Sequence, residues 1–235
     1  MHQIEIAPHA LARAMSRRGR VRIHDSLDPA RTALIVVDMQ NAFVAPGFAL
    51  EIPMAREIVP NINKLAAAVR LTGGKVIWIR NTIQPETAEN WSAWVDDFMT
   101  PAFAEKVFAQ MGRGSEGHQL WPLLDVAPED AQIEKTRFSA LIQGSSDLEA
   151  HLRARGIDTL IITGTATQVC CESTARDAMM LNFTTVFIAD GNAAATDADH
   201  NAALSSLVQI FCDVQTTDEA IACLESGARA KLAAE

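Results

Sequence analysis

Four runs of β-branched and other apolar residues constrain the fold of this chain most. They are TALIVVD at 32–38, KVIWIR at 75–80, TLIIT at 159–163 and TTVFIA at 184–189. Uninterrupted apolar runs of this length are typical of strands buried on both faces of a parallel sheet. With shorter strands expected at 131–134 and 213–215, the pattern predicts an α/β fold: a doubly wound, mainly parallel six-stranded sheet with helices on both faces.

The segments between these strands carry helix signals and one variable stretch. Helices are expected after the paired cysteines, from 218 onward, and at 53–71, 147–155 and 197–209. Periodicity weakens over 81–128, where a doubly wound domain would carry an insertion. Its aromatic residues predict short helices around a small cluster: Trp91, Trp94, Phe98, Phe103 and Phe108.

Length and composition favour a single domain. With 235 residues, of which 49% are hydrophobic and 21% charged, the chain can bury one large core. We expect that domain at 31–235. Residues 1–30 are polar and are predicted to form an irregular arm that lies on the domain or on a partner subunit.

Charge and cysteine usage exclude several classes of function. The formal net charge is −9 and the basic residues form no block beyond RRGR at 17–20, so nucleic-acid binding is not expected. No apolar run approaches the roughly 20 residues that a membrane span needs. The four cysteines form no CxxC pair, which favours free thiols in a reducing cytoplasm.

Three chemically active side chains follow predicted strands. In open parallel sheets the ligand crevice lies at the carboxyl ends of the strands, and Asp38, Lys135 and Cys170 all fall there. Each also has a simpler explanation. The acid could cap loop N–H groups, the lysine could pair with a surface acid, and Cys170 and its neighbour Cys171 could both be small buried hydrophobes.

Together the three groups suggest nucleophilic chemistry. A thiol at the start of a helix meets the positive end of the macrodipole and free N–H groups, which favours its thiolate. A lysine favours both anions, and a carboxylate can accept the thiol proton. The six histidines offer the cysteines no local partner, so the pattern favours an acid as the base.

Three segments resemble the motifs of the isochorismatase-like cysteine hydrolase family. They are DMQNAF (38–43), KTRFSAL (135–141) and GTATQVCCESTARDA (164–178). The third is the most specific, and it is similar to the ureidoacrylate amidohydrolase branch of that family. The resemblance spans about residues 30–220.

The resemblance implies a role for each motif residue. It makes Cys170 the nucleophile, Asp38 the general base and Lys135 the third member of a triad, and it leaves Cys171 as a packing residue. It also implies a cis peptide bond before Ala166. The N–H groups of Ala166 and Cys170 would then form an oxyanion hole.

Candidate substrate-binding residues lie beside the motifs or at strand ends. They are Asn41, Phe43, Asn81, Phe138 and Gln168, with Trp78 as a weaker candidate that could equally be core. Amide side chains could read a urea-type group, and aromatic rings could cover a flat substrate. Glu172 and Arg176 are more simply explained as a structural i,i+4 pair.

These features predict a cysteine-dependent amidohydrolase that cleaves a C–N bond of a small linear amide or ureide, such as ureidoacrylate, biuret or an N-carbamoyl compound. The alternatives are hydrolysis of maleamate-like or aromatic amides, and a non-catalytic binding homologue. No cofactor and no metal is expected, because no histidine occurs between His24 and His118, where metal-dependent relatives carry ligands. The resemblance also implies a homo-oligomer, either a dimer or a tetramer.

Overall fold

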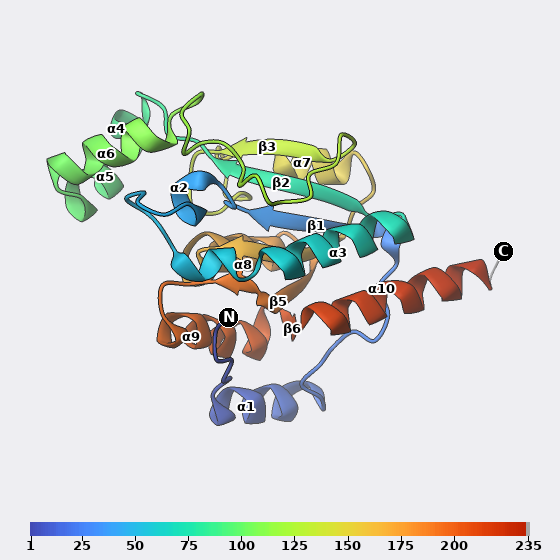
Figure 1. Cartoon of the computed structure of the whole chain (residues 1–235). Helices are drawn as coiled ribbons and strands as arrows, with labels where there is room; N and C mark the ends of the chain where they lie inside the picture. Colours follow the sequence, from blue (N-terminus) through green and yellow to red (C-terminus); the bar gives the residue numbers. More distant parts are fainter. Residues whose placement is uncertain (234–235) are drawn as a thin grey trace.

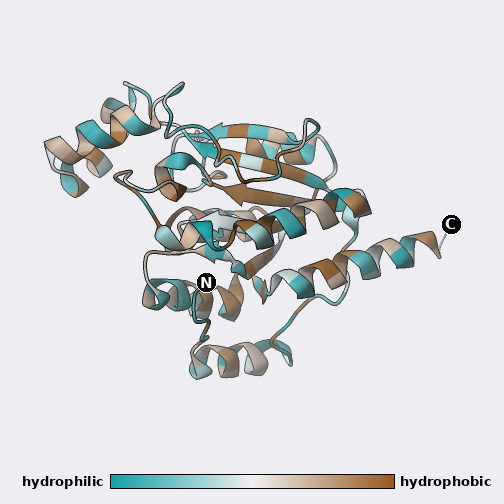
Figure 2. Cartoon of the chain, in the orientation of Figure 1, coloured by the Kyte–Doolittle hydropathy of each residue, from teal (hydrophilic) through white to brown (hydrophobic). Residues whose placement is uncertain are grey.

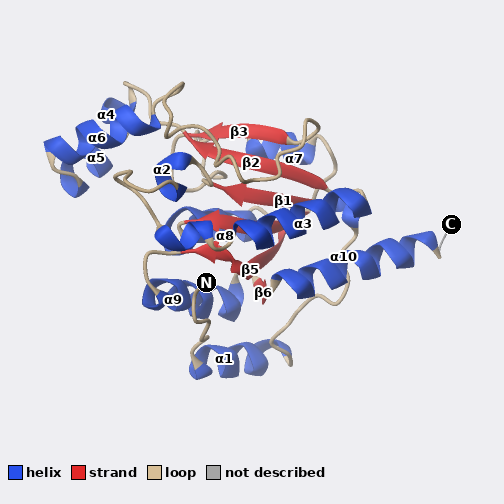
Figure 3. Ribbon diagram, in the orientation of Figure 1, coloured by secondary structure: helices blue, strands red, loops and turns tan. Residues whose placement is uncertain are grey.

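A six-stranded, entirely parallel sheet forms the centre of the molecule (Figures 1 and 3). The computed structural model describes residues 1–233. The strands are β1 (Thr32–Val37), β2 (Lys75–Asn81), β3 (Ala131–Lys135), β4 (Thr159–Thr165), β5 (Thr184–Ala193) and β6 (Asp213–Gln215). Their order across the sheet is β3-β2-β1-β4-β5-β6, so the chain adds strands on one side of β1 up to β3 and on the other side from β4 onward. A doubly wound sheet opens its ligand crevice at this switch point.

Helices cover both faces of the sheet, as predicted. One face carries α3 (Val59–Thr72) and α10 (Thr217–Leu232), and the other carries α7 (Leu148–Arg153), α8 (Glu172–Met180) and α9 (Asp197–Ile210) (Figure 1). Alternate residues of β1 join the two cores: Leu34 and Val36 pack with α3, whereas Ile35 packs with α8. Burial on both faces explains why β1 and most of β2 are hydrophobic (Figure 2).

Two elements differ most from their predicted bounds. The helix expected at 53–71 consists of a short 3₁₀ turn, Pro53–Arg56, followed by α3, which has Pro60 in its first turn, where no intrahelical N–H is needed. The strand expected to end at Ala189 continues to Ala193. Asn192 allows this by donating to the carbonyl oxygens of Ile162 and Ile188 across an irregular register.

The N-terminal arm is more ordered than predicted. Residues 1–30 include an 11-residue helix, α1 (Pro8–Arg18), which packs on α9 of its own chain with Ala10 and Ala14 completely buried. The sequence carried the signals for this helix: a proline in the first turn and Gly19 in the left-handed conformation at its end. The prediction of an irregular arm was wrong because a short polar helix is stabilised mainly by its packing partner.

Pairing of two histidines anchors the first residues of the arm. The rings of His2 and His200 stack with centroids 4.2 Å apart, and His2 Nδ1 lies 2.7 Å from Asp197 Oδ1. His200 is completely buried, and its Nδ1 lies 2.9 Å from the hydroxyl of Thr167. Burial lowers the pKa of His200 to about 4, with a smaller contribution from His2. The arm therefore docks on a neutral imidazole.

This burial predicts how stability depends on pH. Between pH 6.5 and about 4, His200 binds a proton in the unfolded chain but not in the folded protein. The free energy of unfolding therefore falls as the pH falls. We expect His200→Gln to reduce that slope by up to about 1.4 kcal/mol per pH unit. Urea unfolding at pH 7, 6 and 5 measures it, with the exposed His9→Gln as control. Identical slopes in wild type and His200→Gln would contradict the assignment.

The insertion lies beyond the carboxyl edge of the sheet. It forms α4 (Thr87–Asn90), α5 (Ser92–Phe98) and α6 (Pro101–Met111), which project past the arrowheads of the strands near the short helix α2 (Asn41–Val44) (Figure 1). These helices therefore lie at the end of the molecule where the site was predicted. Over residues 1–233, none of the helices is both long and apolar enough to cross a membrane.

Candidate active site

Three residues far apart in sequence meet at the carboxyl ends of the strands. Asp38 follows β1, Lys135 ends β3, and Cys170 lies in the single π-helical turn Thr167–Cys171 after β4. The Nζ atom of Lys135 lies 2.8 Å from Oδ2 of Asp38, and both side chains are completely buried. Both charged groups influence the pKa of the nearby Cys170 thiol: Lys135 lowers it and Asp38 raises it. The structure therefore brings the three predicted side chains into one cluster.

The backbone at the switch point fixes the acid. Asp38 has a φ of 54°, a left-handed conformation that aspartate tolerates better than most residues, and its N–H donates to the Ile79 carbonyl at 3.0 Å. Across from it, Gly164 has a φ of 119°, and a Cβ there would lie 2.0 Å from the carbonyl oxygen of Val37. Only glycine lets β4 pass this close to β1. The glycine of the third motif is thus explained by packing.

Lys135 interacts with one carboxylate and one backbone carbonyl group. Its Nζ donates to the Arg137 carbonyl oxygen at 2.9 Å in addition to pairing with Asp38. Burial lowers the pKa of Lys135, but the neighbouring Asp38 and Cys170 outweigh it and raise the pKa above its usual value. Burial raises the pKa of Asp38 against the opposing effect of Lys135. The lysine therefore stays charged, and the carboxylate is a stronger proton acceptor than an exposed one.

The sequence predicts that Cys170 favours the thiolate, but the structure favours the protonated thiol. Cys170 is only 4% exposed, and burial raises its pKa well above the ordinary value even though Lys135 opposes the shift. The expectation that a helix start would favour the thiolate considered the dipole and the lysine but not the desolvation of the sulfur, which is the larger effect here. The resting thiol is protonated. Chemistry at this sulfur consequently needs a base, and Asp38 is the carboxylate near it.

The turn before the cysteine is closed by one carbonyl. The Thr165–Ala166 peptide bond is cis, as the resemblance implies. The Ala166 carbonyl oxygen accepts from the N–H groups of Val169 and Cys171, at 3.1 and 3.2 Å. The hydroxyl of Thr174 donates to the Cys170 carbonyl at 2.7 Å and accepts from the Ala140 N–H at 3.1 Å. Thr174 thus ties the cysteine turn to the KTRFSAL segment.

A cavity of about 240 Å³ opens beside the thiol. It is lined by Phe43, Leu50, Ile52, Asn81, Trp94, Phe98, Met99, Phe103, Met111, Phe138, Ala166, Val169 and Cys170. Three of the five predicted substrate residues, Phe43, Asn81 and Phe138, are among them. Asn41 is not, and its Nδ2 instead donates to the Glu116 carbonyl at 2.9 Å, while Gln168 is half-buried outside the lining.

Residues outside the predicted set complete the wall. Leu50, Ile52 and Met111 have no local pattern that marks them as pocket residues, because they reach the cavity only through the tertiary fold. Gln40 is completely buried: its Oε1 accepts from the Asn81 N–H at 2.6 Å, and its Nε2 donates to the Asn81 carbonyl at 3.1 Å. Gln40 therefore positions Asn81 on the wall, and its place in DMQNAF was the available signal.

The aromatic cluster of the insertion contacts the second motif. Trp91 and Trp94 stack with centroids 4.5 Å apart, and Phe138 meets Trp94 edge-on at 5.7 Å. Trp78, the weaker substrate candidate, is completely buried, and its indole N–H donates to Asp130 Oδ2 at 2.8 Å, so it belongs to the core. The Glu172–Arg176 pair forms on α8, with 2.6 Å between its charged atoms.

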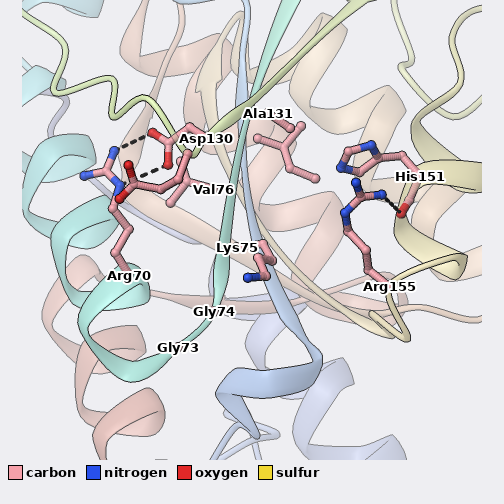
Figure 4. Close-up of a pocket in the computed structure, with 11 residues that line it drawn as sticks. Arg70, Gly73, Gly74, Lys75, Val76, Asp130, Ala131, His151 and Arg155 are labelled. Atoms are coloured by element: carbon pink, nitrogen blue, oxygen red, sulfur yellow. Dashed lines mark hydrogen bonds and ion pairs between the residues drawn. The ribbon is translucent and has the colours of Figure 1, made fainter.

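A second hollow, of about 260 Å³, lies at the amino ends of the strands (Figure 4). It is lined by the first residues of β2 and β3, and its acid and base are already paired: Arg70 binds Asp130. Arg155 donates to the His151 carbonyl at 3.0 Å. This hollow lacks a thiol, and the chemically active cluster lies at the other ends of the strands.

Fold and site together define an α/β protein with a buried acid, ammonium and thiol at the switch point of a parallel sheet. The chain belongs to the isochorismatase family, because the model of the Isochorismatase domain matches residues 32–219. The match begins at β1 and ends within α10, so it includes all six strands and the three motif segments.

Relatives in sequence and in structure agree with this membership. The chain is 33% identical over 202 residues to ureidoacrylate amidohydrolase RutB of Methylobacterium radiotolerans, a match that covers 79% of this chain and 76% of the relative. A crystal structure of a cysteine hydrolase from Pseudomonas syringae pv. phaseolicola is 28% identical, with a TM-score of 0.75, over 88% of this chain and 98% of that one. N-carbamoylsarcosine amidase from Thermoplasma acidophilum shares the fold, with 24% identity and a TM-score of 0.64 over 80% and 97% of the two chains.

Resistance to chelators is a prediction that the sequence makes. The region after the first motif has no histidine, and within residues 1–233 no group of three or more His, Cys, Asp and Glu side chains is placed to hold a metal ion. We expect amide hydrolysis to be unchanged after dialysis against EDTA. The rate is measured before and after dialysis, and again after adding zinc or iron. A large loss on chelation that either metal restores would contradict the expectation.

Proposed function

We propose that this protein is a cysteine-dependent amidohydrolase that cleaves the C–N bond of a small linear amide or ureide through a thioester and releases ammonia. One observation carries the proposal: a buried Asp38–Lys135 ion pair, 2.8 Å between its charged atoms, lies beside a buried thiol that forms part of a cavity wall. The catalytic triad is then Asp38, Lys135 and Cys170.

Each step follows from the protonation states of these groups. Asp38 accepts the proton of the Cys170 thiol, and the thiolate attacks the substrate carbonyl. The N–H groups of Ala166 and Cys170 stabilise the negative oxygen. Asp38 then donates its proton to the leaving nitrogen, the C–N bond breaks, and a thioester remains.

Hydrolysis of the thioester returns the enzyme to its resting state. Asp38 accepts a proton from water, the resulting hydroxide attacks the thioester carbonyl, and the C–S bond breaks as the sulfur regains the proton. Lys135 keeps the carboxylate in place between the two halves of the cycle. Because burial raises the pKa of Cys170, the released sulfur readily takes the proton back.

The substrate class rests on the relatives and on the residues. The name of the 33% identical relative, ureidoacrylate amidohydrolase, supports amides of ureido type, with biuret and N-carbamoyl compounds as further members of that chemical class. Simple amides, maleamate-like or aromatic, undergo the same chemistry. A binding protein without catalytic activity is disfavoured because it would have no use for a thiol, an acid and a lysine buried together at one place.

A substrate panel with product analysis tests the proposal. Ureides, carbamoyl amino acids and simple amides are incubated with the enzyme, and ammonia and carbon dioxide are both measured. Ammonia alone identifies an amide, whereas ammonia with carbon dioxide identifies a ureide. If none of these compounds is hydrolysed, the proposal is wrong, and failure of an electrophile to label Cys170 selectively would then favour the binding protein.

The assembly and location of the protein are part of the same proposal. A dimer or tetramer acting on a small molecule in the cytoplasm, without nucleic acid or membrane, remains our prediction. Light scattering coupled to size-exclusion chromatography measures the assembly. Because α1 packs on α9 of its own chain, the arm is not needed to join subunits.

A further inference from the structure

We infer that the site prefers a neutral amide or urea bearing an aromatic or aliphatic group over a carboxylated ureide such as ureidoacrylate or an N-carbamoyl amino acid. The inference rests on the proposed function and narrows its substrate class. The cavity beside Cys170 carries it, because the reacting carbonyl must lie at the sulfur while the rest of the molecule lies against the remaining wall.

The wall of that cavity is almost entirely apolar. Apart from Asn81 and Cys170, every lining residue presents a hydrocarbon, thioether or aromatic side chain. Phe138 and Trp94 meet at an interplanar angle of 81°, which forms a corner suited to a flat ring. The Asn81 amide can hydrogen-bond the amide head of a substrate near the sulfur. The remaining wall then surrounds an apolar tail.

A carboxylate would find no cation here. Within the described chain, none of the lining residues is positively charged. Lys135 is buried against Asp38, whose own charge would repel a second carboxylate. An unpaired carboxylate moved from water into apolar surroundings is strongly disfavoured.

The basic residues next in sequence to the wall are engaged elsewhere. Arg137 precedes Phe138, but its guanidinium donates to the carbonyl oxygens of Thr136 and Asn90, each at 2.9 Å, and lies 5.1 Å from the centre of the Trp91 ring. Arg56 follows Ile52 by four residues, and it pairs with Glu51 at 2.9 Å. Arg80, which precedes Asn81, pairs with Glu134 at 3.6 Å. None of these three residues lines the cavity.

The size of the cavity limits the tail. At about 240 Å³ it is smaller than the roughly 300 Å³ at the lower end of ordinary ligand pockets. A single ring or a short alkyl chain attached to the amide is the expected scale. Phe98, at the mouth, is 79% exposed and supplies the outermost apolar contact.

Alkylation of Cys170 tests the preference of the cavity without requiring turnover. Rate constants for N-phenyl iodoacetamide, iodoacetamide and iodoacetate are each divided by the rate constant for free glutathione. We expect the phenyl reagent to react fastest and iodoacetate at least about tenfold more slowly than iodoacetamide, because it brings a carboxylate. Iodoacetate matching iodoacetamide, or the failure of all three reagents to reach Cys170, overturns the inference.

A charge introduced at the mouth provides a matched pair of variants. Phe98→Arg should raise the relative iodoacetate rate several-fold by supplying the missing cation. Leu71→Arg, on α3 and 89% exposed, adds the same charge away from the cavity and should leave all three rates unchanged. An equal effect of both variants would mean that net charge, not the cavity, sets the preference, and the inference would fail.

Turnover of matched substrates separates this inference from the function on which it rests. Benzamide is compared with 4-carbamoylbenzoate, and phenylurea with 4-ureidobenzoate. We expect the neutral member of each pair to have a kcat/KM about 100-fold higher or more. Faster hydrolysis of the carboxylated members overturns the inference and leaves the amidase intact. Selective alkylation of Cys170 without hydrolysis of any amide refutes the amidase, and the alkylation order then decides the ligand class.

Discussion

Cys170→Ala is expected to lower kcat/KM for amide hydrolysis by at least about 10⁴-fold, because the variant has no atom that can form the thioester. Cys171→Ala is expected to stay within about threefold of wild type. Cys171 is completely buried among the residues that pack against α8, and its sulfur lies 3.9 Å from the Thr163 carbonyl oxygen, on the core side of the turn.

The two variants control for each other. Each removes one buried sulfur from adjacent positions, so each should cost about 1 kcal/mol of stability, as typical core substitutions do. Thermal unfolding measured beside kcat/KM separates loss of chemistry from loss of fold. If Cys170→Ala kept most of its activity and Cys171→Ala lost it, the nucleophile would have been assigned to the wrong cysteine.

Asp38→Asn is expected to lower kcat/KM by at least about 10³-fold, since amide nitrogen and oxygen cannot accept the thiol proton. It should also lower the free energy of unfolding by about 3–5 kcal/mol, because it leaves the charge of Lys135 buried without a partner. Urea unfolding measures the second effect. The matched control is Asp158→Asn in the exposed pair with Arg31, which should cost less than about 1 kcal/mol.

A double variant separates the two roles of the acid. Asp38→Asn combined with Lys135→Met removes both charges, so it should recover most of the lost stability while remaining inactive. Recovery of activity in the double variant, or full activity in Asp38→Asn alone, would show that the acid is structural and not the base.

The architecture could be predicted because its signals are local. The β-branched runs identified four of the strands. Since parallel strands end at one edge, the convergence of Asp38, Lys135 and Cys170 followed from their positions at the ends of predicted strands. Helix α1 was missed because its stability comes from packing on α9 and not from its own sequence.

The wall of the cavity and the state of the thiol could not be predicted in the same way. Leu50 and Met111 lie outside all three motifs and meet only in the folded chain. The pKa of Cys170 depends on how deeply the sulfur is buried, which the sequence does not state. Thus the sequence indicated the reactive groups, whereas the cavity was needed to argue the kind of molecule they act on.

The proposed mechanism requires a thioester on Cys170, and acid-quenched mass spectrometry can detect it. The Cys171→Ala variant is used so that the peptide spanning the turn contains one cysteine. During hydrolysis of an amide, the peptide should gain a mass equal to that of the acyl group on Cys170, and hydroxylamine should remove this group. An active enzyme whose acyl group is found on another residue would contradict the mechanism.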